Sequence, residues 1–270
     1  MKSPNLDAVA ALIAEVAATE IRPRFQKLAA HEQREKGPGD IVTIADERAE
    51  ATLTPLLMDQ VPHSIVIGEE AAAKDPDLIG RLSADQIAWI VDPVDGTANF
   101  AEGKPDFVSM VALVRGDELI ASWIHLPMTG QTAIAEQGGG ATFDGARIPK
   151  LSPVAEHPAG VVGVGKFSAP SLHPRAEALR REVKQIKSLR CAGLDYLRLA
   201  RGEMDFILFG RAWPWDHAPG ALLVAEAGGV AGHGDGSSYR PSQPFTAEGV
   251  LTARSQQVWR YVLAHLNPPA

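Results

Sequence analysis

The stretch that decides the fold runs from residue 89 to residue 100 and reads Trp-Ile-Val-Asp-Pro-Val-Asp-Gly-Thr-Ala-Asn-Phe. An apolar run ends here in two aspartates, Asp92 and Asp95. Two like charges about 4 Å apart repel by roughly 4 kcal/mol at an effective dielectric constant near 20, so the pair favours a bound cation. Gly96 permits a left-handed backbone, and Thr97 can begin a helix whose free N–H groups point back at the turn. The stretch therefore predicts a strand end where a metal cation and a phosphate meet.

Composition limits the classes of protein to which such a site can belong. The chain has 270 residues, of which 45% are hydrophobic, and a formal net charge of −7. This charge argues against a nucleic-acid-binding surface and favours a small phosphorylated substrate. Cys191 is the single cysteine, which excludes a disulfide framework and a thiolate zinc site. Because we find neither a signal peptide nor an apolar run of about 18 residues, we expect a cytoplasmic protein without membrane contact.

The first half of the chain predicts two long helices packed on an antiparallel sheet. Apolar residues recur at helical spacing over 5–31, and a second helix is expected over 43–61. Alternating or continuous apolar runs then predict a series of strands, at 64–67, 87–91, 107–115, 118–125, 131–136 and 141–143. Residues 1–150 are thus expected to form an α+β half.

The second half of the chain, residues 151–270, has the alternating pattern of an α/β protein. Helices are expected at 174–184, 194–201, 216–227 and 255–266. Strands are expected between them, at 161–164, 206–209, 230–231 and 249–252. Prolines at 153 and 158 predict a break between the halves, and we expect the active site to lie between them.

Further carboxylates stand where strands end or helices begin. Glu69 and Glu70 follow the strand at 64–67, Asp46 lies near a helix start, and Asp216 follows a Trp-Pro-Trp run. Each has a simpler explanation, because charged strand ends are usually solvated and Asp is a common N-cap. We nevertheless expect these positions to converge with the two central aspartates.

Taken together, these motifs resemble the inositol monophosphatase family of metal-dependent, lithium-sensitive phosphatases. The resemblance rests on residues 89–100, on Gly-Glu-Glu at 68–70, on Trp-Asp at 215–216 and on Glu-Ala-Gly-Gly at 226–229. Weaker landmarks at 40–46, 140–145 and 192–195 extend it over nearly the whole chain. It implies a layered αβαβα sandwich of the inositol monophosphatase and fructose-1,6-bisphosphatase type, and a homodimer.

The resemblance also implies a metal site. Its ligands would be the carboxylates of Glu69, Asp92, Asp95 and Asp216 and the carbonyl of Val94. All are hard oxygen donors, which suit two or three Mg²⁺ ions, with Mn²⁺ as a surrogate, and disfavour zinc.

The same resemblance assigns catalytic and substrate-binding residues. Asp46, Glu69 and Thr97 would orient a water that attacks the phosphate in line, without a covalent intermediate. The residues that would bind the substrate are Asp95, Gly96, Thr97, Ala192 and Asp216. The amides of Gly96 and Thr97 would hold the phosphate.

In the family that the chain resembles, selectivity for the substrate comes from residues outside the metal ligands. Asn99 stands where the nucleotide-phosphatase branch usually has Lys-Glu, which favours an inositol monophosphate or a similar polyol or sugar monophosphate. Phe209, however, replaces the family's sugar-contacting glutamate, and Arg190-Cys191 replaces a Gly-Ser pair. Arg190 is either a surface residue or a contact to a second anionic group. Histidinol phosphate, fructose 1,6-bisphosphate and adenosine 3',5'-bisphosphate remain alternative substrates, and a regulatory protein that keeps only the fold is the alternative to an enzyme.

Three other conspicuous side chains have ordinary structural explanations. His217 stands at a helix start and is expected to be exposed, and His125 is expected to end a strand. Cys191 is expected to be a small packing residue rather than a catalyst.

Overall fold

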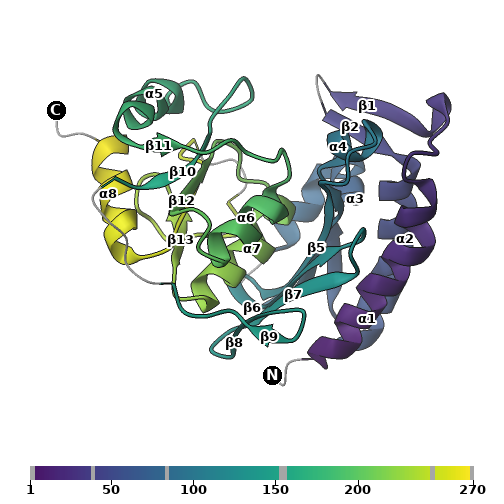
Figure 1. The fold of residues 1–270 in the computed structure, drawn as a ribbon. Coiled ribbons are helices and arrows are strands. Elements are labelled where there is room, and N and C mark those ends of the chain that lie inside the picture. The colour runs from purple at the N-terminus through teal and green to yellow at the C-terminus, as the bar shows by residue number, and fades with distance from the viewer. Residues whose placement is uncertain (1–3, 38–39, 83–84, 152–156, 244–246, 268–270) are drawn as a thin grey trace.

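Five layers of helices and sheets make up the molecule (Figure 1). The computed structural model describes residues 4–37, 40–82, 85–151, 157–243 and 247–267. Its helices form three layers, listed by pairs from one outer face to the other: α1 (Leu6–Val16) with α2 (Ile44–Gln60), α6 (Ala192–Ala200) with α7 (Pro214–Glu226), and α5 (Leu172–Glu182) with α8 (Gln256–Leu266). A β-sheet separates each pair from the next, which confirms the expected αβαβα sandwich.

The first sheet lies between α1 and α2 on one side and α6 and α7 on the other. Its strands follow chain order, as β3 (Ile65–Gly68), β4 (Ile87–Asp95), β5 (Val108–Arg115), β6 (Glu118–Leu126), β7 (Gln131–Glu136), β8 (Gly140–Phe143) and β9 (Ala146–Arg147). All neighbours are antiparallel except β3 and β4, which are parallel. The sheet is therefore mixed at its β3 edge. The parallel pair requires a crossover connection, which the helical segments between β3 and β4 provide.

The second sheet is mixed and does not follow chain order. Its order is β11-β10-β12-β14-β13, where the strands are β10 (Ala159–Gly163), β11 (Lys184–Gln185), β12 (Phe206–Phe209), β13 (Val230–His233) and β14 (Val250–Ala253). β10 is parallel to both β11 and β12, whereas β14 is antiparallel to β12 and β13.

Apolar side chains fill the space between the layers. Ile13 and Leu53 pack with Trp89 and Trp123 in the cluster between the outer helices and the first sheet. The rings of these two tryptophans lie 5.7 Å apart. Each such large side chain stabilises the fold by about 1.5–3 kcal/mol through burial. Within the described residues, no helix is long and apolar enough to cross a membrane.

The N-terminal segment differs from the prediction of one helix over 5–31. The α-helix ends at Val16, and a π-helical turn (Ala17–Ile21) and a 3-10 turn (Arg22–Arg24) follow. Pro23 has no backbone N–H to continue the helix. The chain then forms a two-stranded hairpin, β1 (Gln33–Gly37) and β2 (Asp40–Thr43), that the sequence pattern did not reveal.

Two short helical segments near the β3 edge were not predicted, namely α3 (Glu69–Lys74) and a 3-10 turn (Pro76–Arg81). Glu69 and Glu70 therefore begin a helix rather than extend a strand end. Helix α4 (Thr97–Ala101) begins at Thr97, as the sequence predicted.

Candidate active site

The C-terminal end of β4 is bent so that both of its aspartates face one pocket. The pairing with β5 shifts register between Asp92 and Asp95, and Asp92 Oδ1 accepts the N–H of Val94 at 3.0 Å. Gly96 follows with φ of +89°, and a Cβ at this position would lie 2.8 Å from the carbonyl oxygen of Asp106. Only glycine fits this turn, which directs the chain from the strand into α4.

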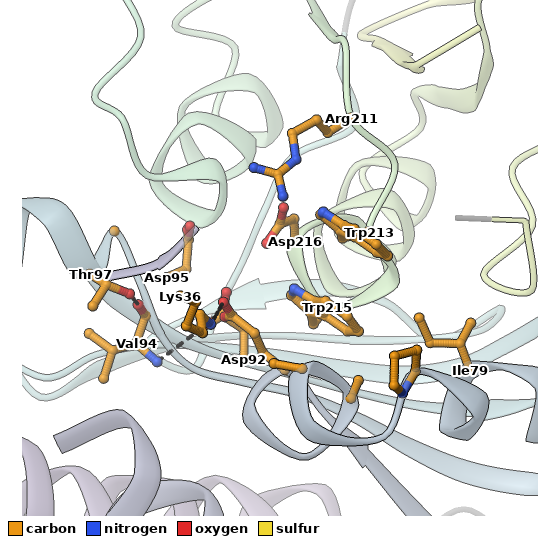
Figure 2. Close-up of a pocket in the computed structure, with 15 residues that line it drawn as sticks. Lys36, Ile79, Asp92, Val94, Asp95, Thr97, Arg211, Trp213, Trp215 and Asp216 are labelled. Atoms are coloured by element: carbon orange, nitrogen blue, oxygen red, sulfur yellow. Dashed lines mark hydrogen bonds and ion pairs between the residues drawn. The ribbon is translucent and has the colours of Figure 1, made fainter. Parts of the chain in front are cut away.

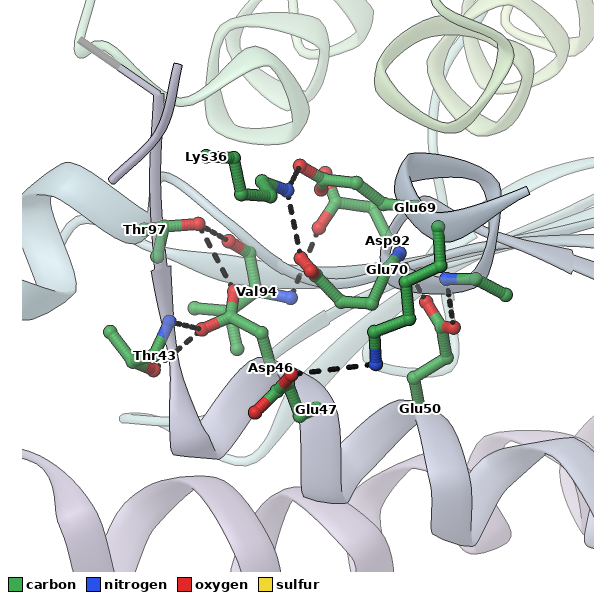
Figure 3. A network of polar contacts seen from close by, with 12 residues as sticks. Lys36, Thr43, Asp46, Glu47, Glu50, Glu69, Glu70, Asp92, Val94 and Thr97 are labelled. Carbon is green, nitrogen blue, oxygen red and sulfur yellow. Dashed lines mark hydrogen bonds and ion pairs between the residues drawn. The ribbon is translucent and has the colours of Figure 1, made fainter. Parts of the chain in front are cut away.

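Thr97 and Asp46 form a hydrogen-bonded pair beside this turn (Figure 3). The Thr97 hydroxyl lies 3.1 Å from Asp46 Oδ1 and 2.9 Å from the carbonyl oxygen of Val94. The other carboxylate oxygen of Asp46 accepts both the N–H and the hydroxyl of Thr43, at 2.9 and 2.5 Å. Complete burial raises the pKa of Asp46 to about 7, against the lowering effect of these bonds. Asp46 therefore acts both as a helix-capping residue and as a partner of Thr97.

The start of α3 carries two glutamates that contact Lys36 of the β1 strand (Figure 3). Lys36 Nζ lies 2.6 Å from Glu69 and 3.0 Å from Glu70. Burial lowers the pKa of Lys36, but the two glutamates raise it more, and the lysine stays charged. Burial and the nearby Glu69 raise the pKa of Glu70 to about 8.

Glu50 of α2 fixes the position of these glutamates. Its carboxylate accepts the N–H groups of Glu70 and Ala71, each at 2.8 Å, which satisfies the first turn of α3. A Cβ on Gly68 would lie 2.2 Å from this carboxylate, so only glycine lets α2 and α3 approach so closely. The placement of Glu69 therefore depends on a residue of the preceding helix.

Asp95 connects the first sheet to α6. Its Oδ2 accepts the N–H of Gly193 at 2.6 Å and lies 3.0 Å from Cys191 Sγ. Burial, followed by the charge of Asp95, raises the pKa of the Cys191 thiol, which therefore stays protonated and donates to the carboxylate. Cys191 is buried, as a packing residue would be.

Asp216 lies in the first turn of α7, among aromatic and basic side chains (Figure 2). The rings of Trp213 and Trp215 stack 5.2 Å apart, and the Arg211 guanidinium points toward Asp216. The prediction that His217 is exposed is wrong. This imidazole is buried, with 3.0 Å between Nδ1 and the Tyr196 hydroxyl and 2.8 Å between Nε2 and the carbonyl oxygen of Arg211, and burial lowers its pKa to about 3.

Most of the predicted site residues line one pocket of about 360 Å³, which we call the acidic pocket (Figure 2). Its wall includes the following predicted residues: Glu69, Asp92, Val94, Asp95, Gly96, Thr97 and Asp216. Asp46 lies behind Thr97, to which it is hydrogen bonded. Lys36 and Arg211 also line the pocket but were not predicted, because neither belongs to an acidic motif.

Ala192 lies in an adjoining pocket of about 270 Å³. We call this the basic pocket, because Lys166, Arg190 and Arg211 line it. Asp95 and Asp216 belong to both pockets, so the two spaces form one continuous cleft.

The donor set of the acidic pocket fits a hard divalent cation. Burial raises the pKa of Asp92 well above its ordinary range, and the charges of Glu69, Asp95 and Asp216 add to this effect. A cation would remove this repulsion, and oxygen ligands of this kind suit Mg²⁺. Within the described part of the chain, no three His, Cys, Asp or Glu side chains are already arranged to hold a metal ion. In this structure Lys36 provides the positive charge that Glu69 and Glu70 contact.

Comparisons of sequence and of structure match this chain to the same group of proteins. Residues 3–266 match the model of the inositol monophosphatase family. A fructose-1,6-bisphosphatase/inositol-1-monophosphatase of Thermotoga maritima is 33% identical over 205 residues, which cover 73% of each chain. The Nus factor SuhB of Vibrio cholerae is 28% identical over 242 residues, which cover 86% of this chain and 85% of SuhB. The solved structure of a Thermotoga maritima IMPase superposes with a TM-score of 0.78 at 26% identity, covering 97% of this chain and 96% of the other.

Proposed function

The chain belongs to the inositol monophosphatase family, and from this membership and the site geometry we propose that it is a Mg²⁺-dependent phosphomonoesterase acting on a small phosphorylated metabolite. One observation carries the proposal. Four carboxylates from three distant segments, Glu69, the pair Asp92 and Asp95, and Asp216, line the same pocket as the Thr97 hydroxyl. Asp92 and Asp95 are buried and Glu69 and Asp216 are half-buried, and so much negative charge in one pocket is costly unless a cation compensates it.

The proposed metal ligands are those four carboxylates and the carbonyl oxygen of Val94. When bound, Mg²⁺ would lower the pKa of a coordinated water and neutralise charge on the phosphate.

The protein's own groups would orient the attacking water. The Thr97 hydroxyl can donate to Asp46 and accept a hydrogen bond from a water on its open side. Asp46 is held by two bonds from Thr43, so the Thr97 hydroxyl has a fixed direction. In the metal-free protein burial raises the pKa of Asp46 to about 7, and a bound cation would lower this pKa and keep the carboxylate ionised as the acceptor of the Thr97 hydroxyl. The amides of Gly96 and Thr97 at the start of α4 would hold the phosphate.

The substrate proposed is inositol monophosphate or a similar polyol or sugar monophosphate. Asn99 supports a monophosphate through its likeness to the inositol-phosphatase branch and not through contact with the substrate. Its side-chain amide donates to the carbonyl oxygens of Asp106 and Leu189, at 2.8 and 2.9 Å. Histidinol phosphate is the first alternative, followed by fructose 1,6-bisphosphate or adenosine 3',5'-bisphosphate. Phe209 in the basic pocket provides no oxygen for a sugar hydroxyl.

The test is hydrolysis of these four phosphates in the presence of EDTA and after readdition of Mg²⁺. We expect release of phosphate from at least one, abolished by EDTA and restored by Mg²⁺, with a monophosphate giving the highest kcat/KM. Turnover that survives complete chelation would contradict the metal-dependent mechanism. Inhibition by lithium and a dimer in light scattering are further expectations of the same proposal.

A regulatory binding protein is the second candidate, and the Vibrio cholerae relative named as a Nus factor supports it. The two candidates differ in the reaction with a phosphomonoester. Release of phosphate at a catalytic rate supports the enzyme, whereas binding of the phosphate without its release supports a regulatory role.

A further inference from the structure

The two pockets of the cleft differ in charge. Both pockets are lined by Asp95, Asp216 and Arg211. The acidic pocket adds two carboxylates, Glu69 and Asp92, and one cation, Lys36, whereas the basic pocket adds the two cations Lys166 and Arg190 and no carboxylate. If the phosphate is bound on the acidic side, the rest of the substrate extends into the basic pocket. The side chains there decide which alcohol the site accepts.

Arg190 is held at the mouth of this pocket in a conformation that non-glycine residues seldom adopt. Its φ is +58°. The segment before it is fixed by Asn99 Nδ2, 2.9 Å from the carbonyl oxygen of Leu189, and by Ser188 Oγ, which accepts the Arg190 N–H at 3.0 Å. Ser188 in turn donates to Asp195 at 2.5 Å. A strained backbone conformation that several hydrogen bonds hold in place often marks a functional position.

Lys166 approaches from a second fixed loop. The Gly165 N–H donates to Ser168 Oγ at 3.0 Å, and a Cβ on Gly210 would lie 1.9 Å from the same oxygen. The loop before α5 therefore packs directly on the loop after β12, which glycine alone permits. Among the described residues, the Lys166 ammonium faces the Phe167 ring at 5.1 Å rather than a carboxylate. Its charge remains available to a ligand.

The polar groups in the remaining wall of the pocket already have partners. Ser168 Oγ accepts the Gly165 N–H, Ser188 Oγ accepts the Arg190 N–H and donates to Asp195, and both nitrogens of His217 lie within hydrogen-bond distance of other groups. A neutral polyol could accept hydrogen bonds from the cations but would leave their charge uncompensated.

We propose that the alcohol half of the substrate carries an anionic group, a carboxylate or a second phosphate, and that Arg190 and Lys166 bind it. The inference rests on the proposed phosphatase activity, because it places the scissile phosphate in the acidic pocket, and it replaces the neutral polyol monophosphate by an anionic one as the preferred substrate. Arginine matches the two oxygens of such a group with two parallel N–H donors, and lysine adds a point charge. The exposed Glu102 lies 3.2 Å from Arg190 and is the partner that a ligand would displace.

The test compares matched phosphomonoesters that differ in this one charge. 3-Phosphoglycerate differs from glycerol 3-phosphate by a carboxylate in place of a CH₂OH group, and fructose 1,6-bisphosphate differs from fructose 6-phosphate by a second phosphate. At fixed free Mg²⁺ we expect kcat/KM to favour the anionic member of at least one pair about tenfold. A preference in the first pair alone identifies a carboxylate, and one in the second pair alone identifies a phosphate and overturns the monophosphate proposal.

Variants assign the preference to the two cations. Arg190→Gln and Lys166→Gln should each lower the ratio of kcat/KM within the preferred pair about threefold or more. Arg181→Gln removes the same charge from the exposed face of α5 and should leave the ratio unchanged. Equal kcat/KM within both pairs, or ratios that the two pocket variants do not change, would overturn the inference.

Binding distinguishes failure of the inference from failure of the proposed function. If none of the phosphates is hydrolysed, the proposed function fails. Calorimetry of both pairs, 3-phosphoglycerate against glycerol 3-phosphate and fructose 1,6-bisphosphate against fructose 6-phosphate, on the unaltered protein and on Arg190→Gln, then decides the inference alone. Tighter binding of the anionic member of either pair that the variant loses supports the inference, and equal binding within both pairs refutes it.

Discussion

The acidic and basic pockets meet at Asp95 and Asp216 but are built in opposite ways. In the acidic pocket Asp92 and Asp95 are buried, and hydrogen bonds fix the groups that support the wall, as Thr43 fixes Asp46 behind Thr97 and Glu50 fixes the start of α3. In the basic pocket the loop backbones are fixed, whereas the charged ends of Lys166, Arg190 and Arg211 reach solvent. In the proposed enzyme the reaction would depend on the fixed groups of the acidic pocket, and the choice of substrate would depend on exposed groups that can change with little effect on the fold.

The strongest test of the acidic side is Asp95→Asn. We expect kcat to fall about 10³-fold, because the variant removes a charged ligand from the centre of the site. Asparagine can still accept the Gly193 N–H, so circular dichroism and the unfolding midpoint should show an intact fold. Asp59→Asn, on the exposed face of α2, is the matched control and should keep its activity. Unchanged turnover in Asp95→Asn would remove the basis of the proposed mechanism.

A smaller effect is expected at Thr97. Thr97→Ala removes the hydroxyl that lies between Asp46 and Val94 and should lower kcat about 10²-fold. Thr97→Ser keeps the hydroxyl and should retain activity to within about tenfold. Single-turnover rates on both variants measure this difference. If serine and alanine lose the same activity, the hydroxyl does not orient the water.

The pH dependence of stability tests the burial of the acidic groups. In the metal-free protein Asp46 and Glu70 have pKa values raised to about 7 and about 8, so the folded state binds more protons than the unfolded state up to these values. Their contribution to stability is present at low pH and is lost as the pH rises through 7 and 8. Urea unfolding with EDTA should give a free energy lower at pH 8.5 than at pH 7 by on the order of 1 kcal/mol.

The control for this experiment is the same comparison in the presence of Mg²⁺. Because the proposed ion favours ionised carboxylates, the loss of stability between pH 7 and pH 8.5 should shrink. His217 contributes little to the change in unfolding free energy between pH 7 and pH 8.5, because its pKa near 3 in the folded state and its ordinary pKa in the unfolded state both lie below this range. Stability that rises with pH in the metal-free protein would show that these carboxylates are not buried as described.

The smallest effect is expected on the basic side. Glu102→Gln removes the carboxylate 3.2 Å from Arg190, and both side chains of this pair are exposed, so the unfolding midpoint should not change measurably. Preference for an anionic substrate should rise about twofold, because Arg190 loses a competing partner. Glu118→Gln, in an exposed pair with Arg115 elsewhere, is the control. A lower preference would mean that Glu102 orients Arg190 toward the ligand.

Sequence reasoning predicted best what depends on local chemistry. The turn after β4 could be predicted because Gly96, Thr97 and the two aspartates each have a local reason to stand there. The order of strands from β4 to β8 also followed from apolar patterns and turn residues. Family membership and the layered fold were confirmed by the comparisons.

What depends on distant partners could not be predicted. The strands of the β1 and β2 hairpin lack a regular apolar alternation, so Lys36 had no pattern to place it beside Glu69. The start of α3 depends on Glu50, about twenty residues earlier in the chain. His217 was expected in solvent, but α6 and the loop before α7 provide partners for both ring nitrogens and bury it.

The middle helical layer has a consequence for how the molecule comes apart. Helix α7 is buried along almost its whole length, and one apolar cluster joins Val108 and Met110 of the first sheet to Leu222 of α7 and Ile207 of the second sheet. A chain cut between residues 147 and 159 would leave each fragment with a large apolar surface in water. The two sheets should therefore unfold together in a single transition. A substitution that destabilises either sheet should lower the activity of the cleft, because residues next to both sheets line it.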